Sequence, residues 1–247
     1  WVDYTGSSPQ SSKGINVVFN YTHAYTTFGI NMAFCPDIPM NDGSFRPVHV
    51  YAPPGCFLNA QFPAPVAARH LTGHFCATAV WGALAKVLPE RVVADSAAVT
   101  IILVAGVNDR GDSFLANAFC AGGMGARAMK DGISSVACPA NIASTPTEVI
   151  EATATLFFKN RELVTDSGGA GKYRGGCGQR INYEVRTSQP AVFSCMWEKV
   201  EHPPFGLFGG QPGAATRVGL YRNGKYQPLP PKGRALLQPK DEVEIFQ

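Results

Sequence analysis

The chain has 247 residues, of which 45% are hydrophobic and only 16% are charged. This composition supports a sizeable core and excludes intrinsic disorder, which requires low hydrophobicity and high net charge. The formal net charge is +3, and the basic residues are scattered along the chain rather than gathered in runs. We therefore expect no nucleic acid and no membrane surface among its partners.

Seven cysteines stand at wide, irregular spacings without a CxxC pair. Disulfide scaffolds are denser and zinc sites pair their cysteines, so we expect free thiols, no bound metal and a cytoplasmic protein. No signal peptide is evident, and charged residues interrupt the longest apolar stretch, 66–88. The chain opens on Trp1 rather than on Met, so we interpret it as a piece of a longer chain.

Two helices are predicted in the first third of the chain. Residues 15–34 form the weaker candidate, because their aromatic and β-branched side chains also favour strands. Residues 65–88 form the stronger one, with Pro65 in its first turn and Pro89 closing it. Apolar side chains lie nearly all round this helix, which predicts that it is buried.

The remainder favours strands. Asn223 and Gly224 separate two short apolar runs, which is a strong signal for a hairpin because both turn residues must accept a positive φ. Apolar or alternating runs predict further strands at 97–104, 153–158, 181–186, 191–197 and 243–246. We expect an α+β fold that is β-rich after about residue 150, organised as parts 1–150 and 151–247 or as one continuous domain.

A glycine-rich stretch, 166–178, has two interpretations. Such a backbone can bring its N–H groups close to an anion. The stretch matches neither a phosphate-binding P-loop nor a dinucleotide-binding motif, because Asp166, Tyr173 and Arg174 occupy required positions. Since a strand rather than a helix follows, we favour a structural connection over a ligand loop.

His70 and His74 stand four residues apart in the predicted helix, so both imidazoles point the same way. The glutamate of the helical zinc motif is absent and no third ligand follows. The pair either lines a site or forms hydrogen bonds within the core, where Asp95 and Asp131 are candidate partners. No nucleophile elbow is present, and a buried thiol is the default state of each cysteine.

Several segments, taken in order, resemble one family. They span nearly the whole chain and are found at residues 3–10, 35–47, 62–70, 122–127, 166–176, 202–204 and 209–213. Their sequences, among them DYTGSSPQ, CPDIPMNDGSFRP, GGMGAR and DSGGAG, resemble the hydantoinase B/oxoprolinase family, and specifically the C-terminal half of its members.

The resemblance implies an ATP-dependent cyclic amide hydrolase that works as a hetero-oligomer. An A-type partner would bind ATP and Mg and activate the amide, and the B-type subunit would complete ring opening with water. A divalent metal is implied in the absent N-terminal half, so this chain alone would be inactive. Related complexes carboxylate ketones, and a non-catalytic fragment that binds the partner is a third possibility.

Within this resemblance, two sets of residues are candidates. The first would line the site for substrate or phosphorylated intermediate, and it consists of Arg69, His70, His74 and Arg127. The second would close over that site or contact the A-type partner, and it consists of Asp166, Ser167, Gly168, Gly169 and Arg174.

Overall fold

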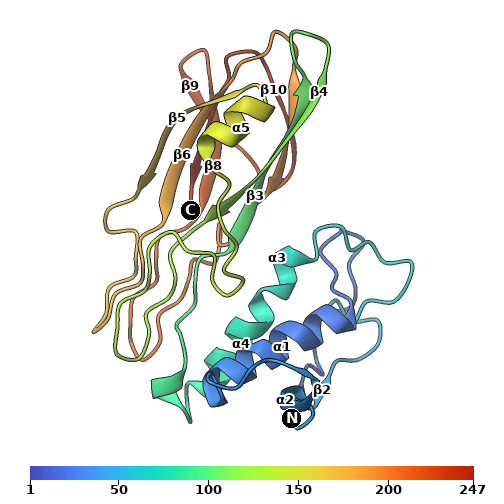
Figure 1. Cartoon of the computed structure of the whole chain (residues 1–247), viewed down its shortest axis with the longest axis vertical. Coiled ribbons are helices and arrows are strands. Elements are labelled where there is room, and N and C mark those ends of the chain that lie inside the picture. Colours follow the sequence, from blue (N-terminus) through green and yellow to red (C-terminus); the bar gives the residue numbers. More distant parts are fainter. The chain divides into compact units, whose positions relative to one another are not determined.

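The computed structural model describes all 247 residues, and its internal contacts divide the chain into two compact units (Figure 1). The N-terminal unit contains residues 1–94 and 127–129, and the sandwich unit contains 95–126 and 130–247. The sequence suggested a division near residue 150. The contacts divide the chain near residue 95 instead, because the strands that follow pair with the C-terminal ones.

The N-terminal unit is mainly helical. Its elements are β1 (Val2–Asp3), α1 (Phe19–Phe34), α2 (Asp42–Phe45), β2 (Val50–Tyr51), α3 (His70–Gly73), α4 (Phe75–Leu84) and the 3₁₀ turn η1 (Pro89–Arg91). Strands β1 and β2 form a short parallel pair. The helix predicted at 15–34 is confirmed as α1, despite its β-branched residues.

The second helix is shorter than the sequence predicted. Residues 65–69 form a turn rather than a helix, because the Pro65 carbonyl accepts from the Asn16 side chain and the Ala68 amide donates to Gly14. The helical stretch begins at His70, and His74 separates α3 from α4 while keeping helical backbone angles. Helix α4 ends at Leu84, four residues before the predicted end at residue 88.

Helix α4 packs closely on α1. A Cβ at Gly29 of α1 would lie 3.1 Å from the Ala77 Cα of α4, and the Trp81 indole donates a hydrogen bond of 3.0 Å to the Gly29 carbonyl. Cys76 and Val80 complete the buried face of α4, whereas Ala79 is exposed. The predicted buried helix is therefore buried on one face.

The sandwich unit consists of two antiparallel sheets. One has the strand order β10-β7-β3-β4 and the other β5-β6-β11-β8-β9. Their bounds are β3 (Val99–Val107), β4 (Ser113–Ala121), β5 (Leu156–Leu163), β6 (Gln179–Val185), β7 (Ala191–Met196), β8 (Arg217–Arg222), β9 (Lys225–Pro228), β10 (Lys232–Leu237) and β11 (Glu242–Phe246). The helix α5 (Thr147–Thr153) contacts β4 and β5.

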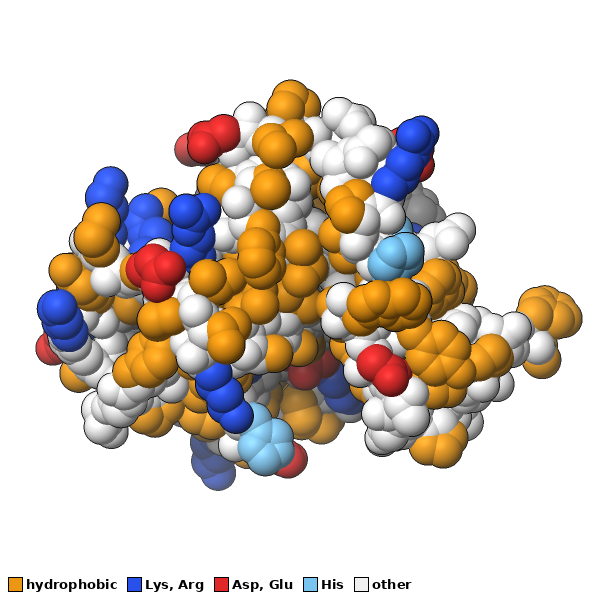
Figure 2. All heavy atoms as spheres, turned by 90° about the horizontal axis from the view of Figure 1, so that it is seen from below, with side chains coloured by type: hydrophobic (Ala, Val, Ile, Leu, Met, Phe, Trp, Pro, Cys, Tyr) orange, Lys and Arg blue, Asp and Glu red, His pale blue; other side chains and the backbone are white.

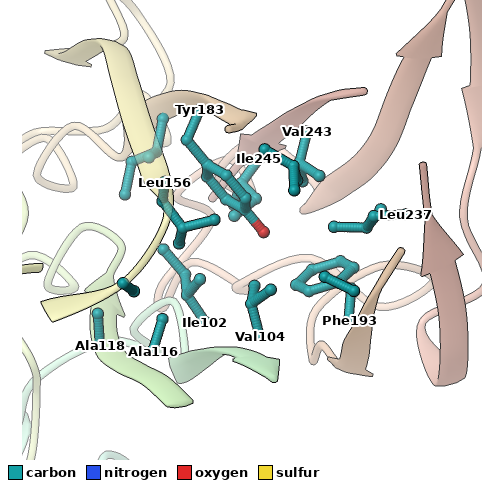
Figure 3. Packing of buried hydrophobic residues seen from close by; sticks show 14 of the residues in the cluster. Ile102, Val104, Ala116, Ala118, Leu156, Tyr183, Phe193, Leu237, Val243 and Ile245 are labelled. Atoms are coloured by element: carbon teal, nitrogen blue, oxygen red, sulfur yellow. The ribbon is translucent and has the colours of Figure 1, made fainter. Parts of the chain in front are cut away.

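Alternating side chains from both sheets fill the space between them. Ile102 and Val104 of β3 meet Tyr183 and Ile245 of the opposite sheet in one continuous cluster (Figure 3). Phe193 of β7, also fully buried, joins them. Strands β4 and β7 bury every second residue along much of their length, which is the pattern that a sandwich core requires.

The predicted hairpin is confirmed. Asn223 and Gly224 join β8 to β9 with φ angles of 52° and 74°. Within the sandwich unit, the strands that the sequence did not reveal are β4 and β10. Residues 147–153 form a helix, so the strand predicted from residue 153 begins at Leu156.

Charged side chains of both signs lie on the surface of the chain. On the face shown in Figure 2, basic and acidic side chains lie among broad apolar and neutral areas, without a continuous field of one sign. No helix is long and apolar enough to cross a bilayer.

Candidate functional site

His70 and His74 lie together, as their spacing predicts. Their ring centroids are 6.5 Å apart in an edge arrangement, with His70 at the start of α3 and His74 where α3 ends. His74 is 5% exposed, whereas His70 is half-buried. The pair therefore has one imidazole enclosed by protein and one nearer the surface.

Two tyrosines of α1 complete this cluster. The rings of Tyr21 and Tyr25 are stacked at 4.8 Å, with an interplanar angle of 13°. The Tyr25 ring lies 5.3 Å from that of His74. We call these four residues the His–Tyr cluster, and it joins one face of α1 to the His70–His74 pair.

The environment keeps His74 uncharged. Burial lowers the pKa of His74 to about 4, and the neighbouring His70 adds to this effect. Burial and a hydrogen bond with Tyr25 raise the pKa of Tyr21, while the charge of Arg69 opposes that shift. At neutral pH the cluster thus presents a neutral imidazole at His74 and a neutral phenol at Tyr21, which can orient a polar ligand by hydrogen bonds.

Tyr21 and Tyr25 were not among the site residues predicted from the sequence. They stand four residues apart in a segment already predicted as a helix, so they share one face. That spacing was a usable signal. The sequence could not indicate which helix this face contacts.

The two predicted arginines occupy different places in the N-terminal unit. Arg69 is exposed, directly before α3, and its charge acts on Tyr21. Arg127 is half-buried, and its backbone pairs with Val93 in an isolated bridge. The structure thus brings the charge of Arg69 close to Tyr21 of the His–Tyr cluster. For Arg127 it shows a backbone pairing with Val93.

The glycine-rich stretch belongs to the sandwich unit, where much of its backbone is committed to neighbouring strands and loops. The Gly175 amide donates to Gly169, that of Gly176 to Met124, and that of Gly178 to the Ser167 hydroxyl. A β-carbon on Gly176 would overlap with the backbone of Ile133. These glycines allow close approach of backbones, which supports the structural interpretation favoured from the sequence.

The candidate loop residues have local partners. Arg174 lies 3.5 Å from Asp166, whose φ is 57°, and both side chains are exposed. Ser167 also donates to the Val164 carbonyl. Gly168 and Gly169 approach the backbones of residues 175 and 211 too closely for a side chain. The tip of the loop, residues 170–172, is exposed and is the part that could contact another molecule.

The sequence suggested Asp95 as a partner of the two histidines, but the structure shows it bonded to other groups. Its carboxylate accepts hydrogen bonds from the Lys199 ammonium and, at 3.3 Å, from the Phe205 amide. Asp131 accepts from the Arg174 amide at 2.8 Å. Asp95 therefore anchors the loop after β7.

All seven cysteines are free thiols. Burial raises the pKa of Cys76 and Cys195 to about 11 and that of Cys120 to about 12. These three thiols remain protonated at neutral pH and are therefore poor nucleophiles. No group of three or more His, Cys, Asp or Glu side chains is arranged to hold a metal ion.

Comparison with known proteins identifies the family. The model of the hydantoinase B/oxoprolinase family matches residues 1–247. The chain belongs to this family. The resemblance seen in the ordered sequence segments is thereby confirmed.

The curated relatives are longer than this chain. An uncharacterised protein of Methanocaldococcus jannaschii is 34% identical over 247 residues, which are 99% of this chain and 43% of the relative. The 5-oxoprolinase 1 of Arabidopsis thaliana is 29% identical over 245 residues, covering 98% of this chain and 18% of that protein. The chain thus spans less than half the length of these relatives.

Two solved structures share the fold. The ATP-dependent caprolactamase of Pseudomonas jessenii has a TM-score of 0.84 and 25% identity, over 97% of this chain and 44% of that one. A nucleotide-free acetone carboxylase has the same TM-score at 20% identity, over 99% of this chain and 38% of that one. The second likeness concerns the fold alone.

Proposed function

We propose that this chain is part of a B-type subunit that opens a small cyclic amide after ATP-dependent activation by an A-type partner. The family match over residues 1–247 carries the proposal. It is supported by two relatives whose names specify cyclic amides, a 5-oxoprolinase and a caprolactamase. The candidate substrates are accordingly hydantoins, 5-oxoproline and related lactams.

The chemistry explains why ATP is needed. An unstrained amide is a poor electrophile, and transfer of the γ-phosphoryl group of ATP to its oxygen makes the ring carbon electrophilic and releases ADP. Water then adds to that carbon and the ring C–N bond breaks, which leaves an amine and an acyl phosphate. A second water releases phosphate and the carboxylate. Overall, one ATP and two waters are consumed for each ring opened.

The N-terminal unit supplies groups suited to this task. The buried, neutral His74 and its neighbour His70 can hold the attacking water or the amide nitrogen by hydrogen bonds. Arg69, at the edge of the cluster, can balance the negative charge of a phosphorylated intermediate. Arg127 is proposed for the same role. The exposed loop tip, residues 170–172, is proposed to contact the partner subunit.

The test uses the complete subunit together with its ATP-binding partner. We expect phosphate release that depends on hydantoin, 5-oxoproline or caprolactam and is matched by ring-opened product. The His70→Ala variant should lower kcat or raise KM at least tenfold, since loss of a general acid–base group typically costs more than that. His202→Ala, at an exposed position of the sandwich unit, is the control.

Other outcomes would replace the proposal. ATP turnover that requires bicarbonate and a ketone, with none on cyclic amides, would indicate a carboxylase subunit. Stable capture of the partner, with kinetics unchanged in the variants of His70, His74, Arg69 and Arg127, would indicate a partner-binding module without catalytic residues.

A further inference from the structure

Tyr21 occupies the space that a side chain at position 73 would need. A β-carbon built on Gly73 would overlap with Cδ1 and Cε1 of the Tyr21 ring and lie 3.2 Å from its Cζ. Gly73 has no positive φ, so glycine is required here for space and not for backbone conformation. The ring of an α1 residue thus lies directly on the backbone of α3, between the two histidines in sequence.

This contact continues through Tyr25 to the imidazole of His74. Tyr25 is stacked on Tyr21, and its other neighbour in the series is His74 at 5.3 Å. His70 follows at 6.5 Å from His74. The His–Tyr cluster is therefore a series of four rings in the order Tyr21, Tyr25, His74 and His70. Its first ring lies on the backbone of Gly73, and its last two belong to the residues at the start and the end of α3.

We infer that Tyr21 and Tyr25 are positioning residues, which fix the orientation of the His74 imidazole through the ring contacts that Gly73 permits. The inference rests on the proposed function, which places His74 at the reaction site. An imidazole can rotate about two bonds, and productive hydrogen bonding requires that this freedom be removed before the substrate arrives. The stacked tyrosines remove it without offering a competing charge.

Hydrogen bonds also fix residues that neighbour the two tyrosines. The Tyr4 hydroxyl lies 2.8 Å from that of Thr26, which itself bonds back to the Thr22 carbonyl one helical turn earlier. Cys76 of α4 is hydrogen-bonded to Tyr4. The titratable groups around the His–Tyr cluster are Tyr4, Arg69 and Cys76.

The first experiment follows the His74 imidazole by NMR in the chain itself, using its resonance position and its titration midpoint. In Gly73→Ala the added methyl group displaces the Tyr21 ring, so we expect the His74 resonance to move and its midpoint to rise from about 4 towards 6.5. Gly82→Ala is the matched control, because Gly82 lies in α4 with nothing within 4 Å of its added β-carbon. It should leave His74 unchanged.

A double variant separates positioning from mere packing. Gly73→Ala combined with Tyr21→Ala removes the overlap, so the melting temperature should recover relative to Gly73→Ala alone. If Tyr21 positions the imidazole, the His74 resonance and midpoint stay displaced in this double variant. Their return to the wild-type values would overturn the inference, as would a Gly73→Ala protein with an unchanged His74.

Tyr25 gives an independent readout should Gly73→Ala fail to fold. Tyr25→Phe retains the ring and should retain the His74 resonance, whereas Tyr25→Leu should displace it. Equal effects of both changes would overturn the inference.

Activity is measured separately in the complex of the complete subunit and its partner. There Tyr25→Leu should lower kcat by one to two orders of magnitude, a range typical of misplaced catalytic groups, and change KM little. A complex without ATP-dependent amide hydrolysis would refute the proposed function, yet the NMR result would still decide the positioning role.

Discussion

Lys199 donates a hydrogen bond to the carboxylate of Asp95, and the two side chains are only 11% and 0% exposed. Lys199 has a φ of 61°, a left-handed conformation that is unusual for a residue other than glycine. Burial raises the pKa of Asp95, and the adjacent ammonium opposes this shift without cancelling it. The pair thus ties the start of the sandwich unit to the loop after β7.

We expect Lys199→Met to destabilise the protein by about 3–5 kcal/mol, because it leaves a buried carboxylate without its counter-ion. Urea unfolding measures this directly. The control is Arg174→Met, since the Arg174–Asp166 pair of the same unit is exposed and should contribute less than about 1 kcal/mol. Equal effects of the two changes would show that the buried pair is not a stabilising contact.

His74 should make stability fall as the pH falls. Its pKa is about 4 in the folded protein and about 6.5 when unfolded, so the unfolded state binds more protons between these values. The free energy of unfolding should therefore decrease by about 3 kcal/mol from pH 7 to pH 4 through this residue alone. In His74→Gln this decrease between pH 7 and pH 4 should be absent, because glutamine does not titrate.

The measurement is the difference in unfolding free energy between the wild type and His74→Gln across that pH range. This difference removes the titration of all other groups that the two proteins share. Curves that run parallel from pH 7 to pH 4 would contradict a buried, neutral His74.

Gly176 should be irreplaceable for a steric reason. An alanine there would place its methyl group against the carbonyl of Ile133, which belongs to the backbone and cannot rotate away. We expect Gly176→Ala to cost at least about 2 kcal/mol. Gly213→Ala is the control, because its nearest contact would be an ordinary 3.4 Å, and it should change the unfolding free energy by less than about 0.5 kcal/mol.

Tyr183 should tolerate loss of its hydroxyl. The group is fully buried between the two sheets and has no hydrogen-bond partner among the protein atoms (Figure 3). An unsatisfied buried polar group is unfavourable, so we expect Tyr183→Phe to be neutral or to stabilise by about 1 kcal/mol. In contrast, Tyr4→Phe should destabilise by about 1 kcal/mol, because it removes the hydrogen bond to Thr26. Thermal unfolding of both variants shows whether each change raises or lowers the stability.

Local patterns were sufficient for several elements. The Asn223–Gly224 turn and the strands around it follow from residues adjacent in sequence, and so does the end of the helical stretch before Pro89. Strand β4 was missed although Phe114, Ala116, Ala118 and Cys120 alternate with outward-facing residues. Two of these four inward residues are alanines, which favour strands weakly, so the alternation carried little signal.

The candidate site, too, was predictable in part from the sequence. The spacing of His70 and His74 put both imidazoles on one side of a helix, and the structure brings them together. Their surroundings depended on contacts between residues some fifty positions apart, such as Tyr21 with Gly73. A helical period specifies which residues share a face, but it contains no information about what that face contacts.

The sequence by itself determined the family, the α+β class, the first helix, the β8–β9 hairpin and the pairing of the two histidines. Each of these depends on neighbouring residues or on ordered motifs. Only the tertiary structure decided that Asp95 pairs with Lys199, that the glycine-rich stretch packs backbone against backbone, and that Tyr21 lies on Gly73 while Tyr25 contacts His74. Packing brings these distant residues together, and a linear pattern does not encode which distant surfaces will meet.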